Sequence, residues 1–227
     1  MSEISRRLLM QASLAAPALA ASAGTAAAAP QPKTLLQLAG QTLQPSRLSD
    51  AALVIIDAQN EYRHGPLALA GIEPAIRHLV ALLKRARAAG TPIIHIAQIG
   101  DPGQMFDRKS ERGQFVKEIT PRAGEMVIEK PLPNAFARTK LHEHLSSLKR
   151  KEIVVAGFMT HMCVSSTVRA GVDLDYRITV ASDATATRAL PAAPAGRAVS
   201  AKEVQASALA ALADFFAAIA PNSGIPT

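Results

Sequence analysis

The chain has 227 residues, of which 48% are apolar and 19% charged, and its formal net charge is +7. This length and composition predict one globular domain with a sizeable core, and they exclude a chain that is disordered throughout. A single Cys excludes an internal disulfide and a Cys-rich zinc site, and no apolar run reaches the ~18 residues that a membrane-spanning helix needs.

Residues 1–29 have the layout of an export signal. An Arg-Arg pair at positions 6–7 precedes a modestly apolar segment at 8–20, and four alanines at 26–29 follow. This order is typical of a secretory signal with a small-residue cleavage site, and the arginine pair resembles the twin-arginine variant. We therefore predict a periplasmic or secreted protein, and a cytoplasmic one if the signal is not processed. A disordered Ala-rich tail is the alternative.

The rest of the chain alternates between strand-like and helix-like segments. Residues 30–50 contain three prolines and predict a leader arm, and residues 221–227 predict a short tail. Five short apolar segments predict strands, at residues 51–56, 92–97, 126–129, 153–157 and 177–181. Helical spacing and helix-start signals predict helices at residues 72–89, 139–148, 163–174 and 201–220. This alternation indicates an α/β domain over residues 51–220 with a parallel sheet.

Residues 100–125 separate the second and third predicted strands. They contain Gly, Pro and charged residues with little periodicity, which predicts a long excursion of a kind that is often functional. In open parallel sheets ligands bind beyond the carboxyl ends of the strands, so the polar residues that follow each strand are the candidates for chemistry.

Three such residues come from distant parts of the chain. Asp57 ends the first predicted strand, Lys130 ends the third, and Cys163 begins the helix after the fourth. A helix N-terminus and a nearby ammonium both lower a thiol pKa, and a carboxylate can accept the thiol proton. The three together predict a thiolate nucleophile at neutral pH. Taken singly, each has a plainer interpretation: a buried Cys, an Asp in a turn and a surface Lys.

The positive charge does not single out a polyanion site. The basic residues are scattered, and few aromatic residues are interleaved to stack on bases. We therefore expect a solvated surface, with no nucleic-acid and no membrane partner.

Four segments carry a family resemblance. They read Asp57-Ala-Gln-Asn-Glu-Tyr62, Glu129-Lys-Pro131 with Asn134-Ala-Phe136, Ala156-Gly-Phe-Met-Thr-His-Met-Cys-Val-Ser-Ser-Thr-Val-Arg169 and Asp183-Ala-Thr-Ala-Thr-Arg188. The chain resembles the isochorismatase-like cysteine hydrolases from about Leu53 to Phe216. The segment around the Cys is highly specific, whereas Lys-Pro alone is weak.

The resemblance implies a three-layer α/β/α sandwich with a mostly parallel, six-stranded, Rossmann-like sheet. It implies a catalytic triad of Asp57, Lys130 and Cys163, and a cis peptide bond between Phe158 and Met159. It also implies an oxyanion hole formed by the backbone N–H groups of Met159 and Cys163. By placement in the family pattern, the pocket candidates are Gln59, Tyr62, Phe106, Phe136, Thr160 and His161.

The implied reaction is hydrolysis of a small-molecule amide C–N bond through a thioester on Cys163. Relatives of the nicotinamidase type carry an Asp-x-His pair near residues 95–110, but only His95 is present here, so we expect no metal and no cofactor. His142 and His144 lie on different helix faces and are poor co-ligands. A vinyl-ether hydrolase, or a non-catalytic relative that binds a small ligand or senses oxidants through its thiol, remains the alternative. Family members commonly form homodimers or homotetramers, so we expect one of these.

Overall fold

The computed structural model describes residues 31–192 and 194–227, so the predicted export signal lies outside the described residues. Its centre is a six-stranded sheet in the order β3-β2-β1-β4-β5-β6, in which every neighbouring pair of strands runs parallel. The strands are β1 (Ala51–Ile56), β2 (Ile93–Gln98), β3 (Met126–Lys130), β4 (Glu152–Phe158), β5 (Arg177–Ala186) and β6 (Ala218–Ala220). The predicted α/β fold and its six-stranded sheet are confirmed.

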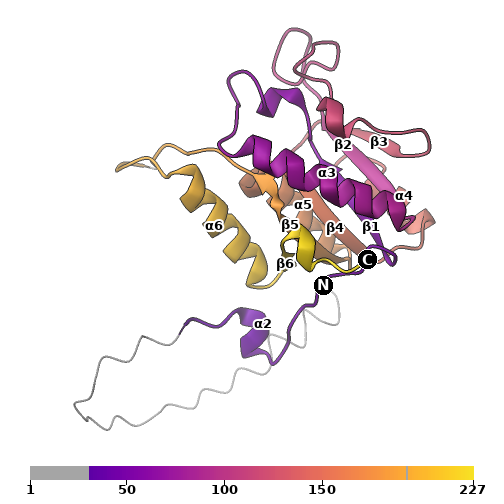
Figure 1. Cartoon of the computed structure of the whole chain (residues 1–227). Helices are drawn as coiled ribbons and strands as arrows, with labels where there is room; N and C mark the ends of the chain where they lie inside the picture. Colours follow the sequence, from indigo (N-terminus) through magenta and orange to yellow (C-terminus); the bar gives the residue numbers. More distant parts are fainter. Residues whose placement is uncertain (1–30, 193) are drawn as a thin grey trace.

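Helices cover both faces of the sheet (Figure 1). Helix α3 (Ile72–Ala88) lies across one face, and α4 (Leu141–Ser147), α5 (Ser165–Asp173) and α6 (Ala201–Ala213) pack on the other. The short helix α2 (Leu35–Leu38) lies in the leader arm. Within the described part of the chain, no helix combines the length and the apolar character needed to cross a bilayer.

The central position of strand β1 in the sheet explains why its sequence is continuously apolar. Leu53 and Ile55 pack into the core cluster that includes α3, whereas Val54 and Ile56 pack into the cluster on the opposite face. Successive side chains of a strand point to opposite faces, so a strand covered on both sides needs apolar residues at every position. The strand ends at Ile56, and Asp57, the next residue, begins the candidate site.

Two predicted helices differ from the structure. The helix predicted over residues 201–220 ends at Ala213, and residues 218–220 form β6 beside β5. The alanine-rich sequence has a high helix propensity, but pairing with the free edge of β5 decides its structure. The helix predicted over residues 163–174 is preceded by a π-helical turn, η3 (Thr160–Val164), and the α-helix α5 begins only at Ser165.

The C-terminal residues pack against α3. Ile225 is buried in the core cluster of α3. Arg85 of α3 donates hydrogen bonds to the carbonyl oxygens of Asn222 and Ile225, and to Oδ1 of Asn222 at 2.9 Å. The Leu48 N–H donates to the Pro226 carbonyl at 2.9 Å. The packed structure therefore continues past residue 220.

We expect Arg85→Met to lower the free energy of unfolding by about 1–3 kcal/mol, because hydrogen bonds from a charged group to a packed segment are lost. Urea denaturation measures the change. Arg77→Met is the matched control, because Arg77 lies on the exposed side of the same helix. Equal unfolding midpoints for the two variants would show that the tail is not held by Arg85.

Candidate active site

The three predicted catalytic residues meet at the carboxyl edge of the sheet. Asp57 follows β1, Lys130 is the last residue of β3, and Cys163 lies in η3 after β4. Lys130 Nζ lies 2.8 Å from Asp57 Oδ2 and 3.4 Å from Cys163 Sγ. Both charged side chains are fully buried, and Cys163 is 4% exposed. Strands far apart in sequence thus bring a carboxylate, an ammonium and a thiol into contact.

A fourth residue, which the sequence analysis did not single out, completes the surroundings of the lysine. Gln98 Oε1 accepts a hydrogen bond from Lys130 Nζ at 2.6 Å, and its Nε2 donates to the Ile99 carbonyl at 3.0 Å. An ammonium has three N–H donors, and Asp57, Gln98 and Cys163 provide its three neighbours. The signal for Gln98 was present in the sequence, because it is a polar residue directly after the second predicted strand.

The electrostatics of the site differ from the sequence-based expectation. Burial, followed by the negative charge of Asp57, raises the pKa of Cys163 to about 12, although the Lys130 charge opposes the shift. Burial also raises the pKa of Asp57, against the attraction of Lys130. This direction disfavours the thiolate that the sequence predicts for the resting protein, because the Asp57 carboxylate already offsets the ammonium charge and a thiolate would be a second buried anion.

The site nevertheless favours transfer of a proton between the Cys163 thiol and the Asp57 carboxylate. Burial raises the pKa of both Asp57 and Cys163, so each holds a proton more tightly than it would in water, and Lys130 Nζ contacts both side chains. Transfer of the proton from the thiol to the carboxylate moves the negative charge from oxygen to sulfur and leaves the net charge of the buried site unchanged. Such a transfer avoids the cost of burying an additional charge.

The turn that carries Cys163 depends on a close approach of two strands. Gly157 has φ of 111°, and a Cβ at this position would lie 2.0 Å from the Ile56 carbonyl oxygen, so only glycine fits. The peptide bond between Phe158 and Met159 is cis, as the family resemblance implies. Because residue 157 is glycine, β4 can lie against β1 until just before the turn that brings Cys163 towards Asp57.

Gln59 connects this cluster to the excursion at residues 100–125. Its N–H groups donate to the carbonyl oxygens of Gln98 at 3.0 Å and Gly113 at 2.9 Å, and its Oε1 accepts from the Gln98 N–H at 2.9 Å. The sequence predicts a pocket role for Gln59. In the structure its amide is fully buried and bound to protein partners, so it positions Gln98 and the excursion.

The excursion is anchored again at its far end. Glu125 accepts hydrogen bonds from Arg87 at 2.7 Å and from the Arg122 N–H at 2.9 Å, and it lies 2.9 Å from Nε2 of the buried His95. Burial alone would raise the pKa of Glu125, but these hydrogen bonds lower it to about 2. The carboxylate therefore stays charged and holds the excursion to β2 and α3 at physiological pH.

Two of the aromatic pocket candidates, Tyr62 and Phe106, pack against each other. Their rings meet edge to face at 5.4 Å, and Tyr62 packs against Phe158 in the same way at 6.0 Å. Burial, followed by the charges of Asp57 and Cys163, raises the pKa of Tyr62 well above its ordinary value. The Tyr62 hydroxyl is thus neutral and close enough to Asp57 and Cys163 for their charges to act on it, and its pocket role stays a prediction.

The other three pocket candidates have different surroundings. Phe136 stacks on Tyr176 at 5.6 Å near Gly171 of α5, and it packs against the same core cluster that includes Cys163. Thr160 is fully buried, and its Oγ1 has no hydrogen-bond partner among the described residues. His161 lies 2.5 Å from the Thr187 hydroxyl through Nδ1, and burial lowers its pKa.

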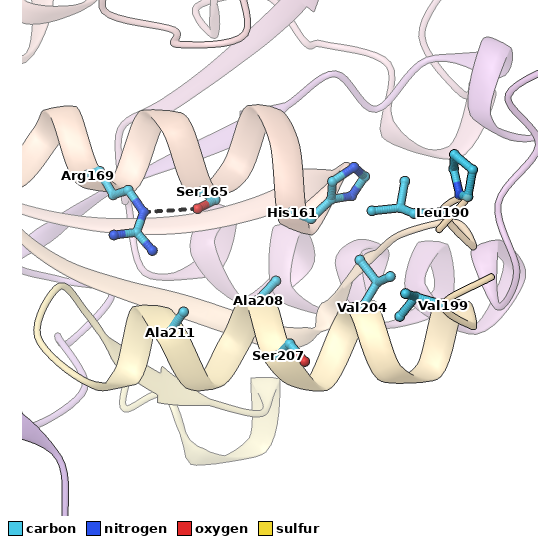
Figure 2. A pocket seen from close by; sticks show the side chains of 10 residues that line it. His161, Ser165, Arg169, Leu190, Val199, Val204, Ser207, Ala208 and Ala211 are labelled. Atoms are coloured by element: carbon cyan, nitrogen blue, oxygen red, sulfur yellow. Dashed lines mark hydrogen bonds between the residues drawn. The ribbon is translucent and has the colours of Figure 1, made fainter. Parts of the chain in front are cut away.

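His161 also lines a cavity of about 460 Å³ between α5 and α6. Figure 2 shows His161 between Ser165 and Leu190, and Arg169 towards one end of the cavity, where its Nε donates to the Ser165 hydroxyl at 3.3 Å. Among the residues that the structure describes, no group of three or more His, Cys, Asp or Glu side chains could hold a metal ion.

We expect Gln98→Glu to slow the alkylation of Cys163 by iodoacetamide by at least tenfold at pH 8. A second carboxylate beside Lys130 would raise the thiol pKa further, and one pKa unit corresponds to a tenfold change in thiolate fraction. Mass spectrometry of the alkylated chain gives the rate. Gln41→Glu, at an exposed position in the leader arm, is the control. An unchanged rate in Gln98→Glu would mean that Gln98 does not influence the sulfur.

Comparisons with known proteins show what this chain is similar to. The isochorismatase domain profile matches residues 51–220. The secreted isochorismatase effector Isc1 of Verticillium dahliae is 37% identical over 177 residues, which cover 78% of this chain and 90% of that protein. Ureidoacrylate amidohydrolase RutB of Klebsiella pneumoniae is 32% identical, with 63% of this chain and 77% of that protein covered. The crystal structure of an isochorismatase from Pseudomonas putida KT2440 has a TM-score of 0.83 at 43% identity and covers 86% of this chain and 100% of that chain.

Proposed function

The chain belongs to the isochorismatase family of hydrolases, and on that premise we propose that it is a cysteine hydrolase that cleaves an amide C–N bond of a small molecule. One observation carries the proposal: Lys130 links a buried carboxylate and a buried thiol, which is the arrangement that nucleophilic catalysis requires. The name of the relative RutB, an amidohydrolase, supports the same class of reaction.

The reaction begins with a neutral Cys163 thiol and a charged Asp57 carboxylate. Asp57 accepts the thiol proton as the sulfur attacks the amide carbon, and the carbonyl oxygen becomes an oxyanion bound by the N–H groups of Met159 and Cys163. When the tetrahedral intermediate collapses, the C–N bond breaks and Asp57 gives its proton to the leaving amine. A thioester remains on Cys163.

Water then completes the cycle. Asp57, again a carboxylate, accepts a proton from the water that attacks the thioester carbon. The C–S bond breaks, the acid product leaves, and the sulfur regains a proton from Asp57. Lys130 keeps its charge throughout and stabilises whichever of the two groups is anionic. The site therefore has no net change of charge at any step.

A screen of small amides and ureides for ammonia release tests the proposal. We expect at least one compound to release ammonia with the full-length protein and none to do so with Cys163→Ala. Turnover of a vinyl ether without amide hydrolysis would instead favour the other reaction of this family. Iodoacetamide labelling without any turnover would favour a thiol-sensing role.

We also propose that the protein is exported. The Arg-Arg pair and the alanines up to Ala29 support this proposal, and the similarity to an effector named as secreted agrees with it. N-terminal sequencing of the protein from cell fractions tests it. A mature chain that starts near Pro30 in the periplasm or medium is the expected result, and an unprocessed cytoplasmic chain would contradict it.

A further inference from the structure

The cavity between α5 and α6, called the α5–α6 cavity below, combines apolar walls with a single charge. Its volume is about 460 Å³, a size typical of sites for small molecules. Apolar side chains line most of it, among them Leu190, Val199 and Val204. Of the ten described residues that line it, only Arg169 carries a permanent charge, and burial lowers the pKa of His161. An anion that enters the cavity therefore meets one cation and, among those ten residues, no acidic side chain.

The guanidinium of Arg169 is oriented by its neighbours and keeps donors available. It lies over the Phe216 ring, with 4.2 Å between Cζ and the ring centroid, and its Nε donates to the Ser165 hydroxyl at 3.3 Å. Within the part of the chain that the structure describes, neither Nη group has a hydrogen-bond acceptor. Figure 2 shows the guanidinium directed from α5 towards α6, into the cavity. A ligand there would bind a side chain that is already oriented, which reduces the entropy lost on binding.

Other half-buried arginines of the chain have acidic partners. Arg87 pairs with Glu125 at 2.7 Å, and Arg63 pairs with Glu73 at 2.7 Å. Arg169 is half-buried as they are, but none of the described residues supplies it with a carboxylate. A charge that is partly removed from water without a counter-ion is costly. Binding an anion at Arg169 would therefore remove a cost that the arginines with acidic partners do not carry.

The charged and apolar parts of the cavity lie at different ends. Figure 2 shows Arg169 towards one end, and Leu190 with Val199 towards the other. The backbones of Leu190 and Val199 exchange two hydrogen bonds of 2.9 Å, which fix this apolar end. Val204 and Ala208 point from α6 into the space between the two ends. A ligand that fits this distribution has an anionic group at one end and an apolar body at the other.

We propose that the α5–α6 cavity binds a small carboxylic acid, with the carboxylate on the Arg169 guanidinium and the apolar body against the opposite end. A guanidinium and a carboxylate form charge-assisted hydrogen bonds of matching geometry. A carboxylate carries one negative charge and so matches the single cation. A phosphate monoester carries nearly two, and the second would remain uncompensated in an apolar space.

The proposed site lies beside the catalytic turn without including the nucleophile. His161 and Ser165 line the cavity, and they lie two residues before and two residues after Cys163. Cys163 itself is 4% exposed and is not among the described residues that line the cavity. Binding of an acid there is therefore independent of the proposed hydrolysis and can be measured without turnover.

Two compounds of nearly equal shape and different charge test the site. Hydrocinnamate carries a carboxylate on a phenyl body, and hydrocinnamyl alcohol is its neutral counterpart. Ligand-observed NMR on the full chain gives both dissociation constants. We expect saturable binding of the acid at millimolar concentration, and binding of the alcohol that is at least tenfold weaker. Prior alkylation of Cys163 with iodoacetamide is expected to leave the Kd of the acid unchanged, because the cysteine lies outside the cavity.

Two variants separate the charge of the site from its space. Arg169→Met keeps an apolar side chain over Phe216, so the Kd of the acid is expected to rise at least tenfold and that of the alcohol to stay the same. Arg77→Met, at an exposed position of α3, is its control. Ala208→Leu fills the cavity and is expected to weaken both compounds. Ala206→Leu, on the exposed side of the same helix, is the control for the added volume.

Several outcomes would overturn the carboxylate site. Among them are no saturable binding of hydrocinnamate, equal affinities of the acid for the wild type and Arg169→Met, and loss of binding after Cys163 is alkylated. Light scattering gives the mass in solution of the wild type and of Ala208→Leu. A dimeric wild type that Ala208→Leu converts to a monomer would mean that a second copy of the chain covers the cavity, and it would overturn the proposal as well.

Discussion

Cys163→Ala is expected to abolish amide hydrolysis, with a fall in kcat of at least about 10⁴-fold, and to leave the fold unchanged. Removing a nucleophile leaves only the binding and oxyanion contributions to the rate. The sulfur is small, and the Asp57–Lys130 ion pair remains, so no buried charge loses its partner. Ammonia release gives the rate, and urea denaturation gives the stability.

Cys163→Ser sharpens this test. A serine hydroxyl has nearly the same size as the thiol but is a far weaker acid, and Asp57 is not basic enough to deprotonate it readily. We expect this variant to be inactive and as stable as the wild type. Substantial hydrolysis by either variant would mean that the reaction does not pass through a covalent intermediate on Cys163.

Asp57→Asn is expected to speed the alkylation of Cys163 and to slow amide hydrolysis, two rates that usually change together. Besides burial, the negative charge of Asp57 raises the Cys163 pKa, whereas the Lys130 charge lowers it. Without the carboxylate, the ammonium has only the sulfur as a counter-ion, so the thiol pKa falls and the thiolate fraction at pH 7 increases. Alkylation by iodoacetamide at pH 7 should therefore become faster.

Hydrolysis by the same variant should fall by about 10²–10⁴-fold, because no group accepts the thiol proton and returns it to the leaving amine. The two rates are measured on one preparation, by mass spectrometry and by ammonia release. Asp175→Asn is the control, since Asp175 is exposed in a left-handed turn that Asn also tolerates. Slower alkylation in Asp57→Asn would show that Asp57 generates the thiolate in the resting protein, and it would contradict the expectation that the Asp57 charge raises the thiol pKa.

The strands that position the candidate site could be predicted from the sequence. Asp57, Lys130 and Cys163 could be grouped because each follows a short apolar segment, and parallel strands share one carboxyl edge. β6 could not be predicted, since three residues that include two alanines carry little strand preference of their own and pair only because β5 offers an edge. The π-helical turn before α5 likewise depends on tertiary packing.

The roles of single polar residues were harder to predict than their positions. Gln98 lies beside Lys130 only because of the register between β2 and β3. Placement in the family pattern predicted a pocket role for Gln59, but the direction of its side chain depends on the Gly113 carbonyl, which the excursion brings back to it. The resting protonation of Cys163 depends on how deeply the pair is buried, which composition does not reveal.

The amide of Gln59 has a consequence for protein engineering. The Gln59 side chain contacts both the excursion, through the Gly113 carbonyl, and Gln98, which accepts a hydrogen bond from Lys130. Exchanging the excursion for that of a homologue, as one would do to change selectivity, therefore also alters the support of the ammonium. Grafts that preserve a backbone carbonyl at the position of Gly113 should keep turnover, whereas those that displace it should lose rate even for compounds that still bind.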